Sequence, residues 1–246
     1  MSTLYAESPR YPIAFEDCHF YHIHDVPGFG RTKGEWNLRS VETYLGNVPL
    51  RGKRVLEIGP ASGYLSFEME KRGASVVAVE VTDSHGWDFV PYPAERMAAV
   101  LGDRAQGMRK LKDSWWFLHE LNASKAKICY TDVYNLPDEL GRFDIAVLAA
   151  VLLHVHSPLE VIAQCARRAD TLVITDMLFK NLEGRPVMEL IPTHDNFAWG
   201  HWWRFSSDLI IQFVRVLGYH NITLTTHDNW HTTLGDAPFF TVVARK

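Results

Sequence analysis

Short apolar runs alternate with amphipathic stretches along the chain, and most of the runs end in a turn signal. The first clear run, Val55, Leu56 and Ile58, stops at Gly59. A stretch able to form a helix follows, and a second apolar run covers residues 75–79. Strand, tight turn, helix and strand in this order predict a βαβ unit over residues 54–82. The rest of the chain is organised around this unit.

The same alternation continues to the end of the chain. The near-continuous apolar run at 143–153 is typical of a central parallel strand buried on both faces. Further strands are expected at 127–133, 171–175, 221–226 and 238–244, the last two forming an antiparallel hairpin. The predicted fold class is therefore α/β, with a Rossmann-like seven-stranded sheet, mostly parallel, a terminal antiparallel hairpin and helices on both faces.

Helices are predicted between these strands. Apolar spacing indicates helices at 36–45, near 95–101, at 115–118 and from Ser206 or Ser207 to Leu217. Ser157 and Glu160 predict a capping box for another helix that begins at Pro158.

Two stretches lack this periodicity. Residues 1–34, rich in Pro, Gly, Tyr and His, are expected to form an irregular N-terminal arm. Residues 35–246 are expected to form one single domain that contains a lid-like insertion at about 176–205. Loops of that length are usually functional or disordered, and the aromatic cluster at 197–205 argues against disorder.

Composition narrows the function classes. The 246 residues are 47% hydrophobic, which is enough for one large core. The formal net charge of −4 and the lack of a long Lys/Arg run argue against a nucleic-acid partner. Three scattered cysteines and the lack of a secretory segment or an 18-residue apolar run predict a cytoplasmic protein without a membrane partner, as a monomer or homodimer.

The turn after the first strand predicts the ligand. A dinucleotide fold needs a glycine two positions after Gly59, where this chain has Ala61. Glu57 would repel a pyrophosphate but attract an ammonium group. Glu80, about 20 residues beyond the first glycine, lies where a carboxylate reaches ribose hydroxyls. S-adenosylmethionine, a nucleoside with an ammonium, a sulfonium and no phosphate, fits better than NAD; the other interpretation is a βαβ unit of some unrelated α/β protein.

Four stretches resemble class I S-adenosylmethionine-dependent methyltransferases: residues 36–39, 52–63, 67–73 and 151–158. They are similar to the group that includes the bacterial enzyme modifying 5-hydroxyuridine at the tRNA wobble position and its short relatives. The resemblance implies that S-adenosyl-L-methionine is the cofactor and that it is bound by Glu57, Gly59, Pro60, Ala61, Gly63, Glu80, Val81, Asp132, Val133, Ala149 and Ala150.

Candidate residues for chemistry follow from position and residue type. Methyl transfer needs a base only if the acceptor must lose a proton. His154, at the end of the fourth expected strand, is the first candidate, and His194 and His201 in the insertion follow; each could also be a structural or surface histidine. No metal site is expected, because the histidines lack convincing ligand spacing.

Candidate substrate residues are aromatic or basic. Trp199, Trp202 and Trp203 could enclose an aromatic or sugar acceptor or simply pack the insertion. The others could hold or cover a substrate, although single basic residues are often only solvated: Arg31, Lys33, Trp36, Arg39 and Arg204.

The sequence thus predicts methyl transfer from S-adenosylmethionine to an O or N acceptor on a small molecule. Two alternative activities remain: a cyclase or lyase that consumes S-adenosylmethionine and releases methylthioadenosine, and tRNA wobble-uridine modification. A non-catalytic binding module is the third reading.

Overall fold

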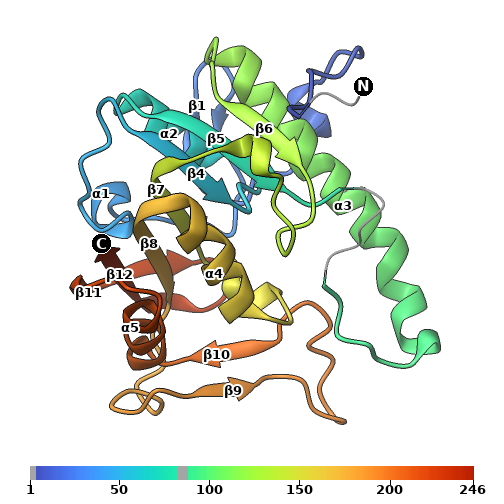
Figure 1. Ribbon diagram of the computed structural model, residues 1–246. Helices are drawn as coiled ribbons and strands as arrows, with labels where there is room; N and C mark the ends of the chain where they lie inside the picture. Colours follow the sequence, from blue (N-terminus) through green and yellow to red (C-terminus); the bar gives the residue numbers. More distant parts are fainter. Residues whose placement is uncertain (1–3, 83–87) are drawn as a thin grey trace.

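Eight strands form the central sheet of the computed structural model, which describes residues 4–82 and 88–246 (Figure 1). Across the sheet the strand order is β3-β11-β12-β8-β7-β4-β5-β6. The strands span Trp36–Asn37 (β3), Arg54–Ile58 (β4), Ser75–Glu80 (β5), Lys127–Tyr130 (β6), Phe143–Ala149 (β7), Ala169–Met177 (β8), Asn221–His231 (β11) and Gly235–Arg245 (β12).

The parallel part of the sheet contains a topological switch point. β4 pairs in parallel with β5 on one side and with β7 on the other. β6 and β8 extend this parallel arrangement outward, whereas β12 is antiparallel to both β8 and β11. In open α/β sheets, ligands bind beyond the carboxyl ends of the strands at such a point. The ends of β4, β5 and β7 are therefore where a site is expected.

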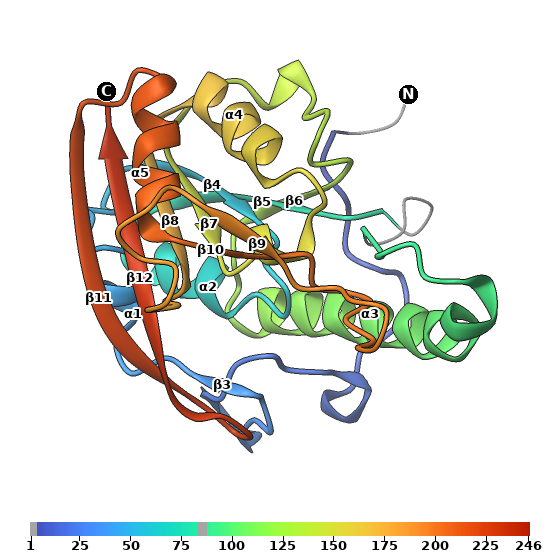
Figure 2. The same ribbon diagram turned by 90° about the horizontal axis from the view of Figure 1, so that it is seen from below.

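Helices cover both faces of the sheet (Figure 2). One hydrophobic core lies on the face of the sheet that α2 and α3 cover, and Trp115 is fully buried in it. The second core lies on the side of α4 and α5, where Tyr219 is fully buried. The helices span Val41–Tyr44 (α1), Tyr64–Lys71 (α2), Ala94–Leu121 (α3), Pro158–Arg168 (α4) and Ser207–Val216 (α5), with short 3-10 turns at Phe15–Asp17 (η1), Asp138–Leu140 (η2) and Leu152–His154 (η3).

The predicted fold class is confirmed, but the sheet has eight strands instead of seven. The additional edge strand is β3, within the stretch predicted as helix 36–45, of which only the single turn α1 is helical. β3 pairs with Trp230 and His231, because β11 extends five residues beyond the predicted end at 226. Local periodicity thus underestimated the length of the hairpin. The extra residues of β11 form the edge with which Trp36 pairs.

Two other helix predictions need correction. The helical segments predicted near 95–101 and at 115–118 are parts of one 28-residue helix, α3; the start of the preceding predicted loop, at 83–87, lies outside the described residues. α4 begins at Pro158 as predicted, but the Ser157 side chain makes no capping hydrogen bond. Ser206 does cap α5, accepting a hydrogen bond from the Leu209 amide.

The less regular segments carry short strands of their own. In the arm, β1 (Asp25–Val26) and β2 (Gly30–Arg31) form a small antiparallel pair. In the segment 176–205, β9 (Met188–Leu190) pairs with β10 (Trp203–Phe205) beside the main sheet. Cys18, Cys129 and Cys165 are free thiols. Within the described ranges, no helix combines the length and apolarity needed to cross a membrane.

Gly63 offers a test of how tightly the first turn is packed. Its φ is +88°, and a Cβ there would lie 2.6 Å from Phe67 and 2.7 Å from Trp115. Gly218 has the same φ, but a Cβ there would meet nothing within 4 Å. We expect Gly218→Ala to cost about 1 kcal/mol of unfolding free energy from backbone strain alone, and Gly63→Ala about 2–4 kcal/mol. Urea unfolding measures both, and equal losses would show that the turn is not crowded.

Candidate active site

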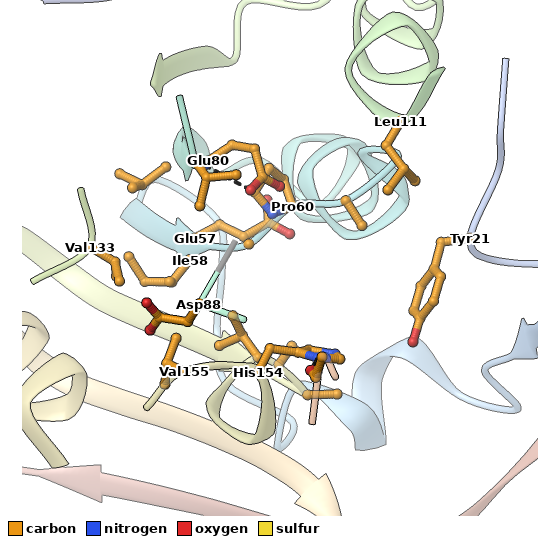
Figure 3. Close-up of a pocket in the computed structure, with 18 of the residues that line it drawn as sticks. Tyr21, Glu57, Ile58, Pro60, Glu80, Asp88, Leu111, Val133, His154 and Val155 are labelled. Carbon is orange, nitrogen blue, oxygen red and sulfur yellow. Dashed lines mark hydrogen bonds between the residues drawn. The ribbon is translucent and has the colours of Figure 1, made fainter. Parts of the chain in front are cut away.

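A cavity of about 350 Å³ opens at the carboxyl ends of β4, β5, β6 and β7 (Figure 3). Its volume falls within the 300–1,000 Å³ typical of small-ligand sites. The strand ends and their loops contribute Glu57, Ile58, Gly59, Pro60, Ala61, Val79, Glu80, Val81, Thr131, Asp132, Val133, Tyr134, Ala149, Ala150, Val151, His154 and Val155. The cavity therefore lies at the topological switch point of the sheet.

The turn between β4 and α2 is built from left-handed backbone. Gly59 and Ala61 have φ of +70° and +50°, and the Gly63 amide donates to the Pro60 carbonyl at 2.8 Å. A Cβ at Gly59 would lie 2.8 Å from Val151, so glycine allows the turn to approach the loop after β7. The result is a tight bend that leaves the space above β4 open to a ligand.

Glu57 places a buried carboxyl group under this bend. Its side chain accepts a hydrogen bond from the Ser66 hydroxyl, to which the Trp115 indole also donates at 3.3 Å. Burial, with a smaller contribution from the charge of Glu80, raises the pKa of Glu57 to about 8. Without a ligand this group is largely protonated at neutral pH, and a cation beside it would favour its ionised form.

Glu80 and Asp132 add two further carboxyl groups at the ends of β5 and β6. Glu80 accepts a hydrogen bond from the Val81 amide at 2.8 Å, and burial raises its pKa. Asp132 accepts a hydrogen bond from the Tyr134 amide at 2.9 Å. Together with Glu57 they give this end of the cavity a hydrogen-bond-accepting and potentially anionic character. Such a set of acceptors suits a phosphate-free, positively charged nucleoside such as S-adenosylmethionine.

The N-terminal arm forms a second wall. The Tyr21 amide donates to the Ser62 hydroxyl in the turn at 3.0 Å, and the His19 amide donates to Ser114 of α3 at 2.8 Å. His19, Tyr21, His22 and Glu35 thereby line the cavity. Burial lowers the pKa of His22 to about 3, so this histidine is neutral. The sequence predicted an irregular arm, but it gave no signal that the arm reaches the cavity.

His154 and His201 lie together at the cavity, with ring centroids 4.8 Å apart. His154 Nδ1 is 2.7 Å from the Gly200 carbonyl, so Nδ1 carries the proton and Nε2 is a hydrogen-bond acceptor. Burial first, and then the nearby His201, lower the pKa of His154 to about 3. A neutral imidazole with a fixed tautomer is the consequence.

A segment of the predicted insertion crosses the cavity. The Val90 amide donates to the Trp199 carbonyl at 2.9 Å, and the Trp202 amide donates to the Leu153 carbonyl at 2.7 Å. Residues 199–202 are thus held between the stretch before α3 and η3. Trp199, Gly200 and His201 line the cavity, facing Arg104 from α3.

Several predicted site residues do not line the cavity. His194 is exposed beside Asp195, and the predicted basic residues lie on the surface, three of them in ion pairs: Arg31 with Asp25, Arg39 with Asp236 and Arg204 with Glu189, while Lys33 is exposed. Trp36 packs against His231 and Phe239, and Gly63, at the end of the turn, packs against Phe67 and Trp115. The indoles of Trp202 and Trp203 donate to the carbonyls of Asp88 and His156.

Sequence reasoning missed the lining residues that come from α3 and from the stretch before it. Arg104 and Leu111 reach the cavity from α3, and Asp88 reaches it from the stretch before that helix. The Asp88 carboxylate accepts hydrogen bonds from the Tyr134 hydroxyl and from the His156 amide. No local pattern marks these positions, because they depend on how α3 crosses the sheet.

Residues 35–223 match the family of methyltransferase domains, and the chain belongs to this family. It is 29% identical over 170 residues to a tRNA U34 carboxymethyltransferase of Pseudomonas aeruginosa, covering 68% of this chain and 43% of the relative. It is 28% identical over 137 residues to a ubiquinone biosynthesis O-methyltransferase of Hahella chejuensis, covering 56% and 46%. The chain spans less than half the length of these curated relatives.

Solved structures of low sequence identity share the fold. The N-terminal domain of EvdMO1, determined with S-adenosylhomocysteine and D-fucose, has a TM-score of 0.60 and 16% identity, covering 91% of this chain and 89% of that one. The 1,6-didemethyltoxoflavin-N1-methyltransferase of Burkholderia thailandensis has a TM-score of 0.56 and 17% identity, covering 85% and 77%. Family and fold together define a class I S-adenosylmethionine-dependent methyltransferase.

Within the described residues, no group of His, Cys, Asp and Glu is arranged to hold a metal ion.

The raised pKa of Glu57 predicts a pH-dependent stability. Between an unfolded pKa near 4.5 and about 8, the folded state keeps a proton that the unfolded state loses, so this contribution to stability falls as pH rises through that window. Glu57→Gln removes the effect. In the absence of ligand, we expect the difference in unfolding free energy between the variant and the wild type to shift by about 1–3 kcal/mol in favour of the variant as pH rises from 5 to 8. Denaturant unfolding across this range tests it, and a difference that does not change with pH would contradict it.

Proposed function

We propose that this protein transfers a methyl group from S-adenosylmethionine to an oxygen or nitrogen of a small molecule, in the cytoplasm and as a monomer or homodimer. The observation that carries the proposal is the single cavity that joins the carboxylate-lined strand ends to a second wall made by the arm, α3 and residues 199–201. One end suits the donor, and the other leaves room for an acceptor of limited size.

The donor end is assigned to residues on the strand ends and the turn. When bound, S-adenosylmethionine supplies a methyl carbon activated by a positive sulfur. Gly59, Pro60 and Ala61 would shape the space for its methionine part, with the Glu57 carboxylate facing the ammonium group. Glu80 would accept hydrogen bonds from the ribose hydroxyls. The adenine would lie by Val81, Asp132 and Val133, and Ala149 and Ala150 would pass close to the reacting carbon.

The acceptor end is assigned to the histidine pair and the residues facing it. His154 is neutral, and its Nε2 can accept a hydrogen bond from the acceptor's O–H or N–H. Because its pKa is near 3, His154 is assigned the role of orienting the acceptor group and not of taking up its proton as a base. Alignment and exclusion of water are the main requirements of an in-line methyl transfer, and residues 199–202 and the arm contribute to both.

Charge favours a small molecule over the tRNA named for the curated relative. The chain has a formal net charge of −4, and four Asp or Glu side chains besides Glu35 line the cavity, against Arg104 as the one Lys or Arg among its described lining residues. Phosphate-rich substrates need the opposite balance. The tRNA wobble position remains the second candidate because of the 29% identity to the carboxymethyltransferase.

Label transfer tests the proposal. The protein is incubated with S-adenosylmethionine labelled in its methyl group and with the small-molecule and RNA fractions of a cell extract, separately. We expect label in small-molecule products and one S-adenosylhomocysteine per transfer. Label in the RNA fraction would support the tRNA alternative, and methylthioadenosine would support a cyclase or lyase. No turnover in any arm would favour the binding module.

Donor binding is expected to depend on Glu80. Glu80→Ala removes the carboxylate assigned to the ribose hydroxyls and should weaken S-adenosylhomocysteine binding by roughly 10- to 100-fold, because bonds to a charged acceptor are each worth about 1.5–3 kcal/mol. Glu120→Ala, on the exposed end of α3, is the matched control and should leave affinity unchanged. Calorimetric titration measures both, and wild-type affinity in Glu80→Ala would refute the assignment.

His154 should contribute by orientation rather than by titration. We expect His154→Leu to lower kcat about 10- to 100-fold on the acceptor found by label transfer, while His154→Gln, which keeps a hydrogen-bonding side chain, retains part of the rate. Since the pKa of His154 is near 3, kcat of the wild type should show no His154-dependent inflection between pH 5 and pH 8. An inflection near pH 6.5 that His154→Leu abolishes would show a base instead.

A further inference from the structure

The side chain of Arg104, in α3, lines the cavity. Its guanidinium carbon lies 5.8 Å from the centre of the Trp199 ring, within the range of a cation–π contact. Its charge is close enough to influence Glu80, Tyr21, Glu35 and His201. Arg104 therefore faces the region between the donor end and the arm.

The other charges around the cavity are unevenly distributed. Glu57, Glu80 and Asp132 gather at the strand ends assigned to the donor. On the opposite side His22 and His154 are neutral, because burial lowers the pKa of each to about 3. Glu35 also reaches this side, but its side chain is 51% exposed and lies 3.7 Å from His231 Nε2. Asp88 lines the cavity as well, and its carboxylate accepts hydrogen bonds from the Tyr134 hydroxyl and the His156 amide. Among the described lining residues, Arg104 is the one Lys or Arg.

A bound methyl donor would add positive charge to the same space. A carboxylate placed between the guanidinium and the sulfonium would be attracted by both groups in this partly dehydrated cavity. Guanidinium groups bind carboxylates through paired N–H donors, and Tyr21 supplies a phenol on the same side. Burial raises the pKa of Tyr21 to about 12, so it remains a hydrogen-bond donor.

We propose that Arg104 binds a carboxylate of the methyl acceptor, with Trp199 beside it, so that the acceptor is an acidic small molecule whose hydroxyl or amino group faces His154. This inference rests on the proposed function, because it assumes that the cavity holds donor and acceptor together. It narrows the substrate class from any small molecule to a carboxylic acid.

The test compares acids with their uncharged amides on protein saturated with S-adenosylhomocysteine. Two pairs are used: 4-hydroxybenzoate with 4-hydroxybenzamide, and 3-hydroxybutyrate with 3-hydroxybutyramide. In the wild type, we expect at least one acid to bind tenfold or more tightly than its amide. Arg104→Gln should reduce that ratio to within twofold, and Arg104→Lys should keep part of it. Arg109→Gln, an exposed arginine five residues along α3, is the matched control and should keep the full ratio.

The outcomes separate this inference from the proposed function. Saturation with S-adenosylhomocysteine is established first by calorimetry for each variant, and failure of the wild type to bind it would contradict the proposed function itself. If the wild type binds it but shows no preference for either acid, or if Arg104→Gln keeps the preference, the assignment of Arg104 is overturned. Loss of S-adenosylhomocysteine affinity in Arg104→Gln with the acid preference intact would instead show that Arg104 only balances Glu80.

Discussion

Carboxyl groups held at the carboxyl edge of a parallel sheet are the constraint on which this structure depends. Glu57 and Glu80 lie at the carboxyl ends of adjacent strands, Glu57 buried and Glu80 half-buried, and desolvation makes each harder to ionise than in solution. Such an arrangement stores an electrostatic cost that a cation relieves. The bend at Gly59 leaves space for that cation above β4, and a dinucleotide, with two phosphates, would increase the cost instead.

The remainder of the fold closes the cavity over this edge. The arm is fixed to the turn through Ser62 and to α3 through Ser114, which brings Tyr21 and His22 to the site. Residues 199–202 are fixed from two sides, by Val90 and by Leu153. These closing segments differ in character from the strand ends: they bring aromatic rings and the histidines His22 and His201 to the cavity. A fold of this kind supports many chemistries, and its function depends on the residues that line the site.

The parallel sheet and the edge at which the cavity opens could be predicted from the sequence, because both depend on local signals. Apolar runs that end in glycine define β4 and β5, and the position of Glu80 follows from the length of one βαβ unit. Long-range pairing was not predictable in this way. Trp36 became a strand residue because the extended hairpin offered an edge, and two apparent helices merged into α3 because polar residues at 102–110 do not interrupt an exposed helix.

The same distinction applies to the candidate site. Ten of the eleven predicted cofactor residues line the cavity, since strand ends meet wherever the strands are parallel. Arg31, Arg39 and Arg204 instead form surface ion pairs, and Arg104, which reaches the cavity, was not singled out. The helix or hairpin that carries a basic residue determines whether its side chain faces the cavity or the solvent. The residue type alone does not predict this.

Proton release on ligand binding tests the central electrostatic claim most directly. Calorimetry of S-adenosylhomocysteine binding near pH 7, repeated in buffers of different ionisation enthalpy, counts the protons exchanged. Because the pKa of Glu57 is about 8 without ligand, the account predicts release of close to one proton as this group ionises beside the ammonium, and its loss in Glu57→Gln. Binding without proton release, or equal release from Glu57→Gln, would contradict the claim.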